Sequence, residues 1–362
     1  MIESFIVRNF KNIEEIHLPR LKRVNLIVGK NGVGKSTLLE AIALYVSGGD
    51  RYVINSLLKG RGEALNDRIE DSDSLEQNKE HLLTLFKDWR EDYSRKFYIL
   101  VGEPEKHFVK MRQIYIEDLK DEEDPTSAQL KLFDDEEIIQ DKRNQGNISS
   151  QGVIVETLGR MSLLRYDRSY ILPRGRVIQP IVRTWEINSD YNADVFDKIA
   201  LSEDEKFIVK ALNIINEDID RITFVSEGYR IRNRVPMVSL KSTGKKVRLS
   251  SMGDGVNRIL TIILSLLNAK GNVLLIDEFE TGLHYSVQKQ LWSIIFMLAE
   301  KLDVQVFITT HSSDTLHSFA NTNIEGKGML IRLEQRQEGI VPVCYEDNNE
   351  ILFAAEYDIE LR

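Results

Sequence analysis

The sequence lacks a cysteine pair, a long apolar run and a cleavable leader. Cys344 is the single cysteine among 362 residues, which excludes an internal disulfide and a multi-cysteine zinc site. No stretch of about 18 apolar residues occurs, so the sequence predicts no membrane-spanning helix. The first residues, MIESFIVRNFKNIEEI, have neither the cationic start nor the small-residue cleavage site of a signal peptide. We therefore expect a cytoplasmic location.

The sequence also has fewer basic than acidic residues. The chain carries 48 Lys and Arg against 57 Asp and Glu, and its formal net charge is -9. This balance argues against a surface coated with non-specific DNA-binding charge, although it leaves room for a local basic patch. The sequence contains no guanine-reading N-K-x-D motif, no C-x-x-C pair and no long coiled-coil pattern. A GTPase and a head with a long coiled-coil arm are both disfavoured.

Along most of the chain, short apolar runs that are typical of buried strands alternate with apolar residues at the spacing of helices. We expect strands at 2–8, 22–28, 229–248, 273–277 and 304–310. We expect helices at 36–45, 202–222, 254–268 and 286–301. A capping box of Ser202 with Glu205 would begin the second of these helices. Apolar strands separated by helices indicate an α/β fold with a mostly parallel central sheet, preceded by N-terminal antiparallel strands.

The stretch 50–165 differs from the rest in being polar and acidic. It contains a helical pattern near 75–93 and two acidic runs, EDLKDEEDP (117–125) and DDEE (134–137). Such a composition favours a mobile insertion or solvated loops, with a partner-binding surface as the alternative. The sequence therefore predicts three parts, which are an N-terminal lobe 1–49, a helical and irregular insertion 50–165, and the remaining core 166–362.

A glycine-rich segment follows the second expected strand. GKNGVGKS, from Gly29 to Ser36, fits the pattern G-x-x-x-x-G-K-[ST] and precedes an expected helix. Its glycines let successive backbone N–H groups point at phosphate oxygens, and the helix N-terminus adds partial positive charge. Lys35 is expected to reach the β- and γ-phosphates, and the Ser36 hydroxyl to ligate Mg²⁺. The expected nucleotide-binding residues are Gly29, Asn31, Gly32, Gly34, Lys35, Ser36 and Thr37.

Two further buried strands end in polar residues that suit phosphate chemistry. VLLIDE (273–278) places Asp277 and Glu278 at the C-terminal edge of a strand, where ligands bind in open α/β sheets. Asp277 is the expected Mg²⁺ partner, and Glu278 is expected to orient and polarise the attacking water. FITTHS (307–312) carries His311, which is placed to contact the γ-phosphate or the water. The expected catalytic residues are Lys35, Glu278 and His311.

A second glycine-containing segment, LSSMGDGVNR (249–258), precedes an apolar helix. Small residues at a helix start make another N-terminus that suits an anion. One nucleotide does not need two such sites, so the economical explanation is that Ser251 and Gly253 complete the nucleotide site of a second copy. The sequence therefore predicts a head-to-tail dimer or a higher homo-oligomer.

In this order the four motifs resemble those of the ABC ATPase superfamily, where they are called Walker A, signature, Walker B and switch histidine. In this resemblance Ser251 matches the signature serine, with Ser250 as the alternative. The opening IESFIVRNFKNIEEIHLPRLKRVNLIVGKNGVGKSTLLEAI is similar to that of RecF, SMC and OLD-type ATPases. DEFETGLHYSVQKQLW, FITTHSSDTL and the final YDIELR resemble OLD-like ATPases of bacterial defence, such as that of the PARIS anti-phage system. The resemblance implies an ABC-type P-loop head that binds ATP and Mg²⁺ and hydrolyses ATP to ADP and phosphate.

The resemblance also implies partners. OLD-like heads commonly work with a Toprim-type nuclease, and too few residues follow His311 in the 362-residue chain for a fused nuclease domain. We therefore expect a separate effector, controlled or scaffolded by the nucleotide-gated head dimer in anti-phage defence. A transporter subunit is disfavoured because the signature lacks the LSGGQ form.

The alternative function is a RecF- or SMC-like DNA-binding ATPase of DNA repair or genome maintenance. Its support is two groups of basic residues that are able to contact DNA phosphates. They are Arg160, Arg165, Arg168, Arg174, Arg176 and Arg183, and Lys241, Lys245, Lys246 and Arg248. Against it stands the acidic total of the chain.

Overall fold

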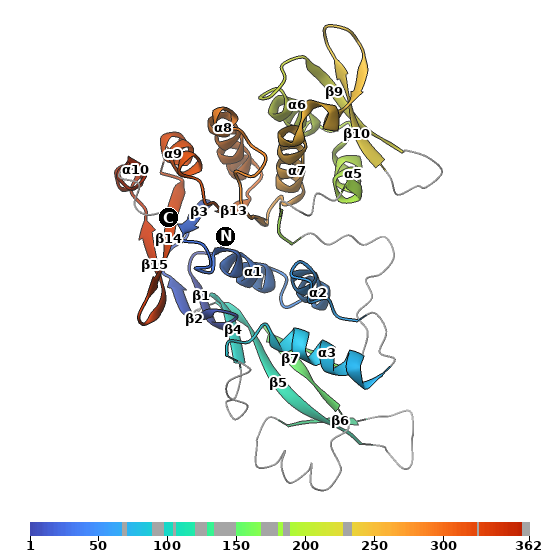
Figure 1. Ribbon diagram of the computed structural model, residues 1–362, viewed down its shortest axis with the longest axis vertical. Helices are drawn as coiled ribbons and strands as arrows, with labels where there is room; N and C mark the ends of the chain where they lie inside the picture. Colours follow the sequence, from blue (N-terminus) through green and yellow to red (C-terminus); the bar gives the residue numbers. More distant parts are fainter. Residues whose placement is uncertain are drawn as a thin grey trace. The chain divides into compact units, whose positions relative to one another are not determined.

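The structure is a computed structural model, shown in Figure 1. It describes residues 1–66, 71–88, 98–103, 106–119, 129–133, 150–167, 180–183, 189–226, 234–323 and 326–356. The chain divides into two compact units. The first unit comprises Met1–Glu3, Leu18–Leu39 and Ile181–Arg362, and the second comprises Ser4–His17 and Glu40–Pro180. Every residue that the sequence assigns to nucleotide chemistry belongs to the first unit.

The first unit is built on a five-stranded sheet with the strand order β12-β13-β3-β14-β15. Its strands are β3 (Val24–Gly29), β12 (Val273–Ile276), β13 (Gln305–Thr309), β14 (Gly328–Arg336) and β15 (Gly339–Tyr345). The first four strands in this order are parallel, and β15 returns antiparallel to β14. The predicted α/β fold with a mostly parallel central sheet is therefore confirmed.

The position of β3 explains how the sheet gathers the motifs. All six residues of β3 are buried, as expected for a central strand of a parallel sheet that is covered on both faces. Its neighbours are β13 and β14, and β12 lies beyond β13. Because β3, β12 and β13 are parallel, their C-terminal ends lie at one edge of the sheet. The loop 29–36, Asp277 and His311 follow these three ends.

Helices and a second, smaller sheet complete the first unit (Figure 1). The helices are α5 (Ser189–Ile199), α6 (Glu205–Leu212), α7 (Asp254–Asn268), α8 (Tyr285–Lys301), α9 (Ser313–Thr322) and α10 (Asn348–Glu356), and α1 (Lys35–Val46) begins in this unit. The smaller sheet is antiparallel and contains β9 (Ile219–Ser226), β10 (Arg234–Leu240) and β11 (Lys246–Arg248). A short 3-10 helix, Leu249–Met252, leads from β11 into α7.

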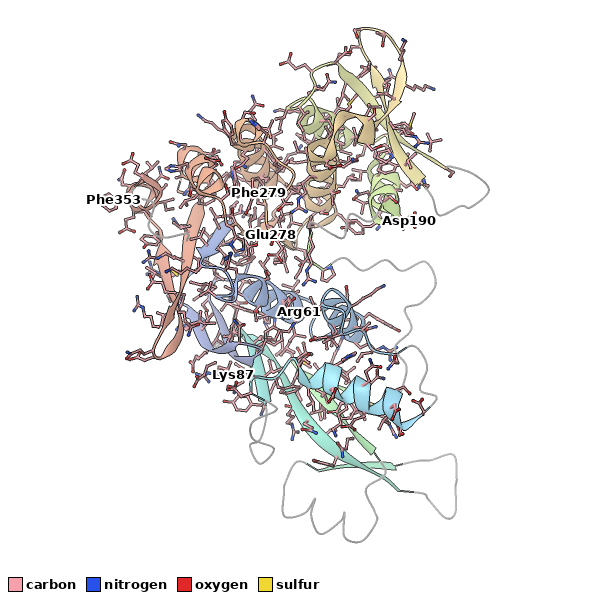
Figure 2. The ribbon with its side chains drawn as sticks, viewed as in Figure 1. Arg61, Lys87, Asp190, Glu278, Phe279 and Phe353 are labelled. Atoms are coloured by element: carbon pink, nitrogen blue, oxygen red, sulfur yellow. The ribbon has the colours of Figure 1, made fainter. Side chains whose placement is uncertain are left out.

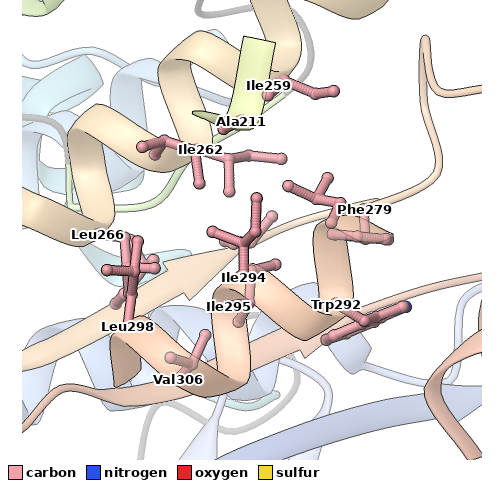
Figure 3. Close-up of a cluster of buried hydrophobic side chains, with 14 of the residues drawn as sticks. Ala211, Ile259, Ile262, Leu266, Phe279, Trp292, Ile294, Ile295, Leu298 and Val306 are labelled. Atoms are coloured by element: carbon pink, nitrogen blue, oxygen red, sulfur yellow. The ribbon is translucent and has the colours of Figure 1, made fainter. Parts of the chain in front are cut away.

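The core of the first unit includes the apolar faces of α7 and α8 (Figure 3). Ile262 of α7, Ile295 of α8 and Val306 of β13 are fully buried in it. Phe279, three residues after β12, stacks on Trp292 of α8 with ring centroids 4.4 Å apart. Burial of each such side chain contributes about 1.5–3 kcal/mol to stability. The turn that carries the expected catalytic acid is therefore anchored in the core through Phe279.

The second unit contains a seven-stranded sheet in which β2-β1-β4-β5-β7-β8 are neighbours in that order and β6 pairs with β5. Its strands are β1 (Phe5–Phe10), β2 (Ile13–Leu18), β4 (Tyr98–Glu103), β5 (His107–Leu119), β6 (Gln129–Phe133), β7 (Ser150–Thr157) and β8 (Arg160–Arg165). Its further helices are α2 (Arg51–Lys59) and α3 (Ser72–Leu83). The N-terminal strand β1 is antiparallel to β4.

Strands within 50–165 correct the expectation of a helical and irregular insertion. The helices α2 and α3 are present, but the described residues of this stretch also form five strands. Along β5, Val109 and Met111 are fully buried while the residues between and beside them are not. This period-2 pattern covers only a few residues, because Gln113 is not buried and Ile114 is, so a short window of sequence does not show it clearly. The run 134–137 and residues 89–93 lie outside the described part of the chain.

The expected helix at 202–222 is shorter, and its capping box is wrong. The helix α6 ends at Leu212, and Ile219 already belongs to β9. The N-cap residue is Asp204, without a side-chain cap, whereas Ser202 accepts a hydrogen bond from Asp204 N at 3.2 Å. Asn216 Oδ1 accepts from Asp218 N at 3.0 Å, a local turn that ends the helical path.

Candidate nucleotide-binding site

Glycines shape the loop between β3 and α1. Positive φ angles occur at Gly29 (144°), Gly32 (78°) and Gly34 (100°). At Gly29 space is also short, because an added Cβ would lie 2.5 Å from the Leu333 carbonyl oxygen of β14. Asn31 is exposed in the loop, and Thr37 is buried on α1. The loop thus curls into α1, whose first N–H groups have no partner within the helix and suit an anion.

The side chain of Lys35 folds back over this loop. Its ammonium donates to Gly29 O at 2.6 Å and to Lys30 O at 3.0 Å, and the residue is only 4% exposed. Burial lowers the pKa of Lys35 to about 8, while the carboxylates of Asp277 and Glu280 oppose this shift. Phosphate oxygens are charged acceptors, so they would compete well with the two neutral carbonyls for this ammonium.

Two motifs that are far apart in the sequence meet at Asp277. Ser36 Oγ donates to Asp277 Oδ1 at 3.0 Å, and Thr309 Oγ1 donates to the same oxygen at 2.5 Å. The two residues assigned to Mg²⁺ are therefore in contact. One hydroxyl and one carboxylate suit Mg²⁺, which takes few protein oxygens and completes its shell with phosphate and water. Among the described residues, no cluster of three His, Cys, Asp or Glu side chains offers another metal site.

The backbone at Glu278 takes an uncommon left-handed conformation. Its φ is 51°, a region that non-glycine residues rarely adopt and that stores about 1–3 kcal/mol of strain. Two hydrogen bonds hold it: Glu278 N donates to Thr309 Oγ1 at 2.9 Å, and Phe279 N donates to Thr309 O at 3.0 Å. Phe279 is fully buried, whereas Glu278, labelled beside it in Figure 2, is partly exposed. The turn therefore directs Phe279 into the core and leaves the Glu278 carboxylate accessible.

A buried arginine of the signature helix supports the same turn. Arg258 of α7 is 2% exposed and donates to Asp277 O at 2.8 Å, to Glu278 O at 3.1 Å and to Arg183 O at 3.1 Å. Burial lowers the pKa of Arg258 to about 10, so the guanidinium stays charged at neutral pH. Val182 adds a further contact with the strand end, because Asp277 N donates to its carbonyl at 2.9 Å.

His311 follows β13 in a turn that a carboxylate holds. Glu280 Oε1 accepts from His311 N at 2.8 Å, and Glu280 Oε2 accepts from Thr310 Oγ1 at 2.7 Å. Partial burial and the nearby Lys35 ammonium lower the pKa of His311, so the imidazole is mainly neutral at pH 7. His311 follows β13, which is the parallel neighbour of β3, and β3 leads into the loop 29–36. A neutral imidazole is able to accept or donate one hydrogen bond at this position.

The two predicted signature residues, Ser251 and Gly253, lie just before α7 and are exposed. Ser251 Oγ donates to Arg248 O at 2.6 Å, and Gly253, with φ of 99°, is the N-cap of α7 without a side-chain cap. An added Cβ at Gly255 would lie 2.6 Å from Gly282 O, so the first turn of α7 packs closely against the turn after the expected catalytic acid. Participation of Ser251 and Gly253 in the site of a second copy stays a prediction.

Sequence reasoning missed several members of this network. Thr309 is a polar residue that ends an otherwise apolar strand, and Glu280 follows Glu278 by two positions, so both carried a recognisable signal. Arg258 also carried one, because it is a charged residue within the apolar pattern of 254–268. Arg183 showed no pattern of its own, since its role depends on where the chain crosses the end of β12.

The structure also changes the interpretation of the basic groups. Arg183 is 3% exposed, so it is not available to DNA. Arg165 pairs with Asp167 at 2.8 Å, and Arg160 is exposed. Arg168, Arg174 and Arg176 lie outside the described residues. The remaining basic residues are exposed on the turn and strand that precede the signature, and they are Lys241, Lys245, Lys246 and Arg248.

Comparison with known proteins agrees with this site. Residues 24–316 match the family described as "AAA domain, putative AbiEii toxin, Type IV TA system". An ATP/GTP phosphatase of Helicobacter pylori is 24% identical over 381 residues, which cover 96% of each chain. An uncharacterized protein of Methanocaldococcus jannaschii is 37% identical over 67 residues, covering 17% of this chain and 31% of that protein. The crystal structure of an SMC head bound to the C-terminal winged-helix domain of ScpA has a TM-score of 0.51 at 14% identity, covering 97% and 99% of the two chains.

The fold and the site define a P-loop protein with an AAA-type domain. The family match includes the loop 29–36, the acids 277–278 and His311. This chain belongs to that family of AAA domains. The likeness to the SMC head concerns the fold alone. In the part of the chain that the structure describes, no helix is long and apolar enough to cross a bilayer.

Proposed function

We propose that this chain binds Mg²⁺-ATP on the loop 29–36 and hydrolyses it to ADP and phosphate. The observation that carries the proposal is the hydrogen-bonded set of Ser36, Asp277 and Thr309. It joins the phosphate-binding loop to the strand end from which Glu278 emerges. The Helicobacter pylori relative is named ATP/GTP phosphatase, which supports the same class of reaction.

In the proposed reaction, water attacks the γ-phosphorus and the bond between the γ-phosphorus and the β–γ bridging oxygen breaks. The Glu278 carboxylate orients the water and draws on its proton, and His311 contacts the water or a γ-oxygen. Lys35 and the N–H groups of the loop neutralise the charge on the phosphates, which is the main contribution of a protein to phosphoryl transfer. The left-handed turn at Glu278 is held by Thr309 and Arg258, which fixes where the carboxylate leaves the backbone.

The Ser36 hydroxyl and the Asp277 carboxylate would hold Mg²⁺ in this site. The ion supplies charge neutralisation at the β- and γ-oxygens when it is bound. Thr309 assists by donating to Asp277 Oδ1, which restrains the orientation of that carboxylate. Two protein ligands suit an ion that keeps water and substrate oxygens in its shell.

We further propose that two copies of the chain enclose two nucleotides between them. The exposed start of α7, with Ser251 and Gly253, would meet the γ-phosphate held by the other copy. ATP would then bind the closed dimer more tightly than the open one, and only that difference in affinity shifts the equilibrium. Hydrolysis would remove the contact and release the closed state.

The molar mass of Glu278→Gln protein with Mg²⁺-ATP tests this arrangement. We expect light scattering to show the mass rising to that of a dimer when Mg²⁺-ATP is added, because the variant binds ATP but turns it over slowly. The control is Lys35→Ala, which loses the ammonium that faces the phosphates and should not respond. A Glu278→Gln protein that stays monomeric at saturating ATP would contradict the sandwich.

The biological output we propose is control or scaffolding of a separate effector, of the Toprim nuclease kind, in anti-phage defence. Its support is the family description, which refers to the AbiEii toxin and a TA system, together with the OLD-like motifs of the sequence. A tagged chain, expressed with its neighbouring genes, should co-purify with one of their products. Purification of the chain alone from such cells, with and without ATP, would contradict the effector proposal but not the ATPase proposal.

A further inference from the structure

The carboxylate of Glu280 is committed to the turn that carries His311. One oxygen accepts from the His311 backbone N–H at 2.8 Å, and the other accepts from the Thr310 hydroxyl at 2.7 Å. Thr310 is fully buried, and its Oγ1 also accepts from Ser312 N at 3.0 Å. Ser312 in turn caps α9, since its side chain accepts from Thr315 N. A single carboxylate therefore anchors the whole path from the end of β13 to the start of α9.

Glu280 belongs to the same turn as the proposed water-orienting acid. Glu278 precedes it by two residues, and the backbone between them is held to Thr309 by the hydrogen bonds of Glu278 N and Phe279 N. Residues Thr309, Thr310 and His311 are thus joined to residues Glu278, Phe279 and Glu280 one after another. Such a ladder of contacts leaves little freedom for one turn to move without the other.

We propose that Glu280 is a positioning residue that holds His311 at a set distance from Glu278 and the phosphates. The inference rests on the proposed ATPase function, because only there do Glu278 and His311 act on one phosphoryl group. Glu280 itself touches no reacting atom in this proposal. It acts by fixing the backbone N–H of His311 and the hydroxyl of Thr310, and so the direction from which the imidazole approaches.

Two substitutions of Glu280 separate its hydrogen bonds from its charge. Glu280→Gln keeps the shape, because the amide oxygen is able to accept from His311 N while the amide nitrogen donates to the Thr310 hydroxyl oxygen. Glu280→Ala removes both contacts. We expect Glu280→Ala to lower kcat by about 10- to 100-fold, since small misplacements of catalytic groups have effects of this order. The KM for ATP should change by less than about 3-fold, and Glu280→Gln should restore most of kcat.

Combination with His311→Ala tests whether Glu280 acts through His311. If it does, Glu280→Ala with His311→Ala should be no slower than His311→Ala alone, because the residue being positioned is already absent. If the two losses multiply, or if Glu280→Gln is as slow as Glu280→Ala, the positioning role is overturned. The matched control is Glu300→Ala, which removes an exposed acid of α8 paired with Lys327 and should leave kcat unchanged.

Folding and the parent proposal are checked separately. Thermal unfolding of each variant shows whether it is folded. If Glu280→Ala is not, Thr310→Val serves instead, because at nearly constant volume it removes the Thr310 contact of Glu280 together with the hydrogen bond from Ser312 N, and it should show the same non-additivity with His311→Ala. Loss of turnover in Glu278→Gln together with full turnover in Glu280→Ala overturns the positioning role alone. Full turnover in Glu278→Gln overturns the proposed function, and this inference with it.

Discussion

Glu278→Gln should lower the rate of ATP turnover by about 10²- to 10⁴-fold, the range usual for loss of a positioned general base. The amide keeps the size of the side chain but cannot draw a proton from water. The turn itself should persist, because the contacts that fix it involve backbone atoms of residue 278: its N–H donates to Thr309, and its carbonyl accepts from Arg258. ATP affinity should therefore stay close to that of the parent protein.

Single-turnover hydrolysis of radiolabelled ATP, with the protein in excess, measures the chemical step directly. Equilibrium binding of ATP to the same variant shows whether the site is intact. Glu300→Gln is a suitable control, because it makes the same chemical change on the exposed side of α8. Turnover of Glu278→Gln within a few-fold of the parent, with normal binding, would assign the water to another residue.

Arg258→Ala should lower the free energy of unfolding by about 3–4 kcal/mol. The substitution removes a buried charged donor from the carbonyls of Arg183, Asp277 and Glu278, although Glu278 O keeps the hydrogen bond from Thr281 N, and it opens a cavity. The substitution also removes the free-energy cost of burying the charged guanidinium, and this offsets part of the loss. Turnover should fall as well, because the Glu278 carbonyl loses one of the contacts that hold its left-handed backbone.

Urea unfolding, followed by circular dichroism, measures the change in stability. Arg258→Met is the informative companion, since it fills much of the volume and isolates the lost hydrogen bonds. Arg221→Ala is the control, because the Arg221 side chain is 85% exposed and its removal should change stability by no more than about 0.5 kcal/mol. A stability of Arg258→Ala equal to that of Arg221→Ala would show that water replaces the guanidinium at little cost.

Much of the candidate site was predictable because its residues are contiguous in short motifs. Three glycines at set spacing impose the curled loop, and a run of apolar residues before Asp277 imposes a buried strand that ends at the acid. Both signals are local: they depend on backbone conformation and on the burial of neighbouring residues. The supporting residues are not local. Glu280, Thr309 and Arg258 meet the motifs only after β12, β13 and α7 have packed together.

The errors along the chain have the same origin. The helical spacing that continues past Leu212 competes with a strand whose pairing with β10 is made only in the folded chain. In the stretch 50–165, β5 gains its stability from β4, β6 and β7, which occupy both of its edges. Pairing partners that lie tens of residues away leave little trace in a short window of sequence.

By itself, the sequence determined the class of fold, the curled phosphate loop and the strand that delivers Asp277 and Glu278. These depend on glycine conformations and apolar periods that act over a few residues. Tertiary structure alone decided that Ser36 touches Asp277, that Thr309 joins Asp277 to the Glu278 turn, and that Arg258 holds that turn from α7. Ser36 and Asp277 are 241 positions apart, and the contacts of Thr309 and Arg258 also join different elements. The order of strands in the sheet and the packing of α7 bring these residues within hydrogen-bonding distance.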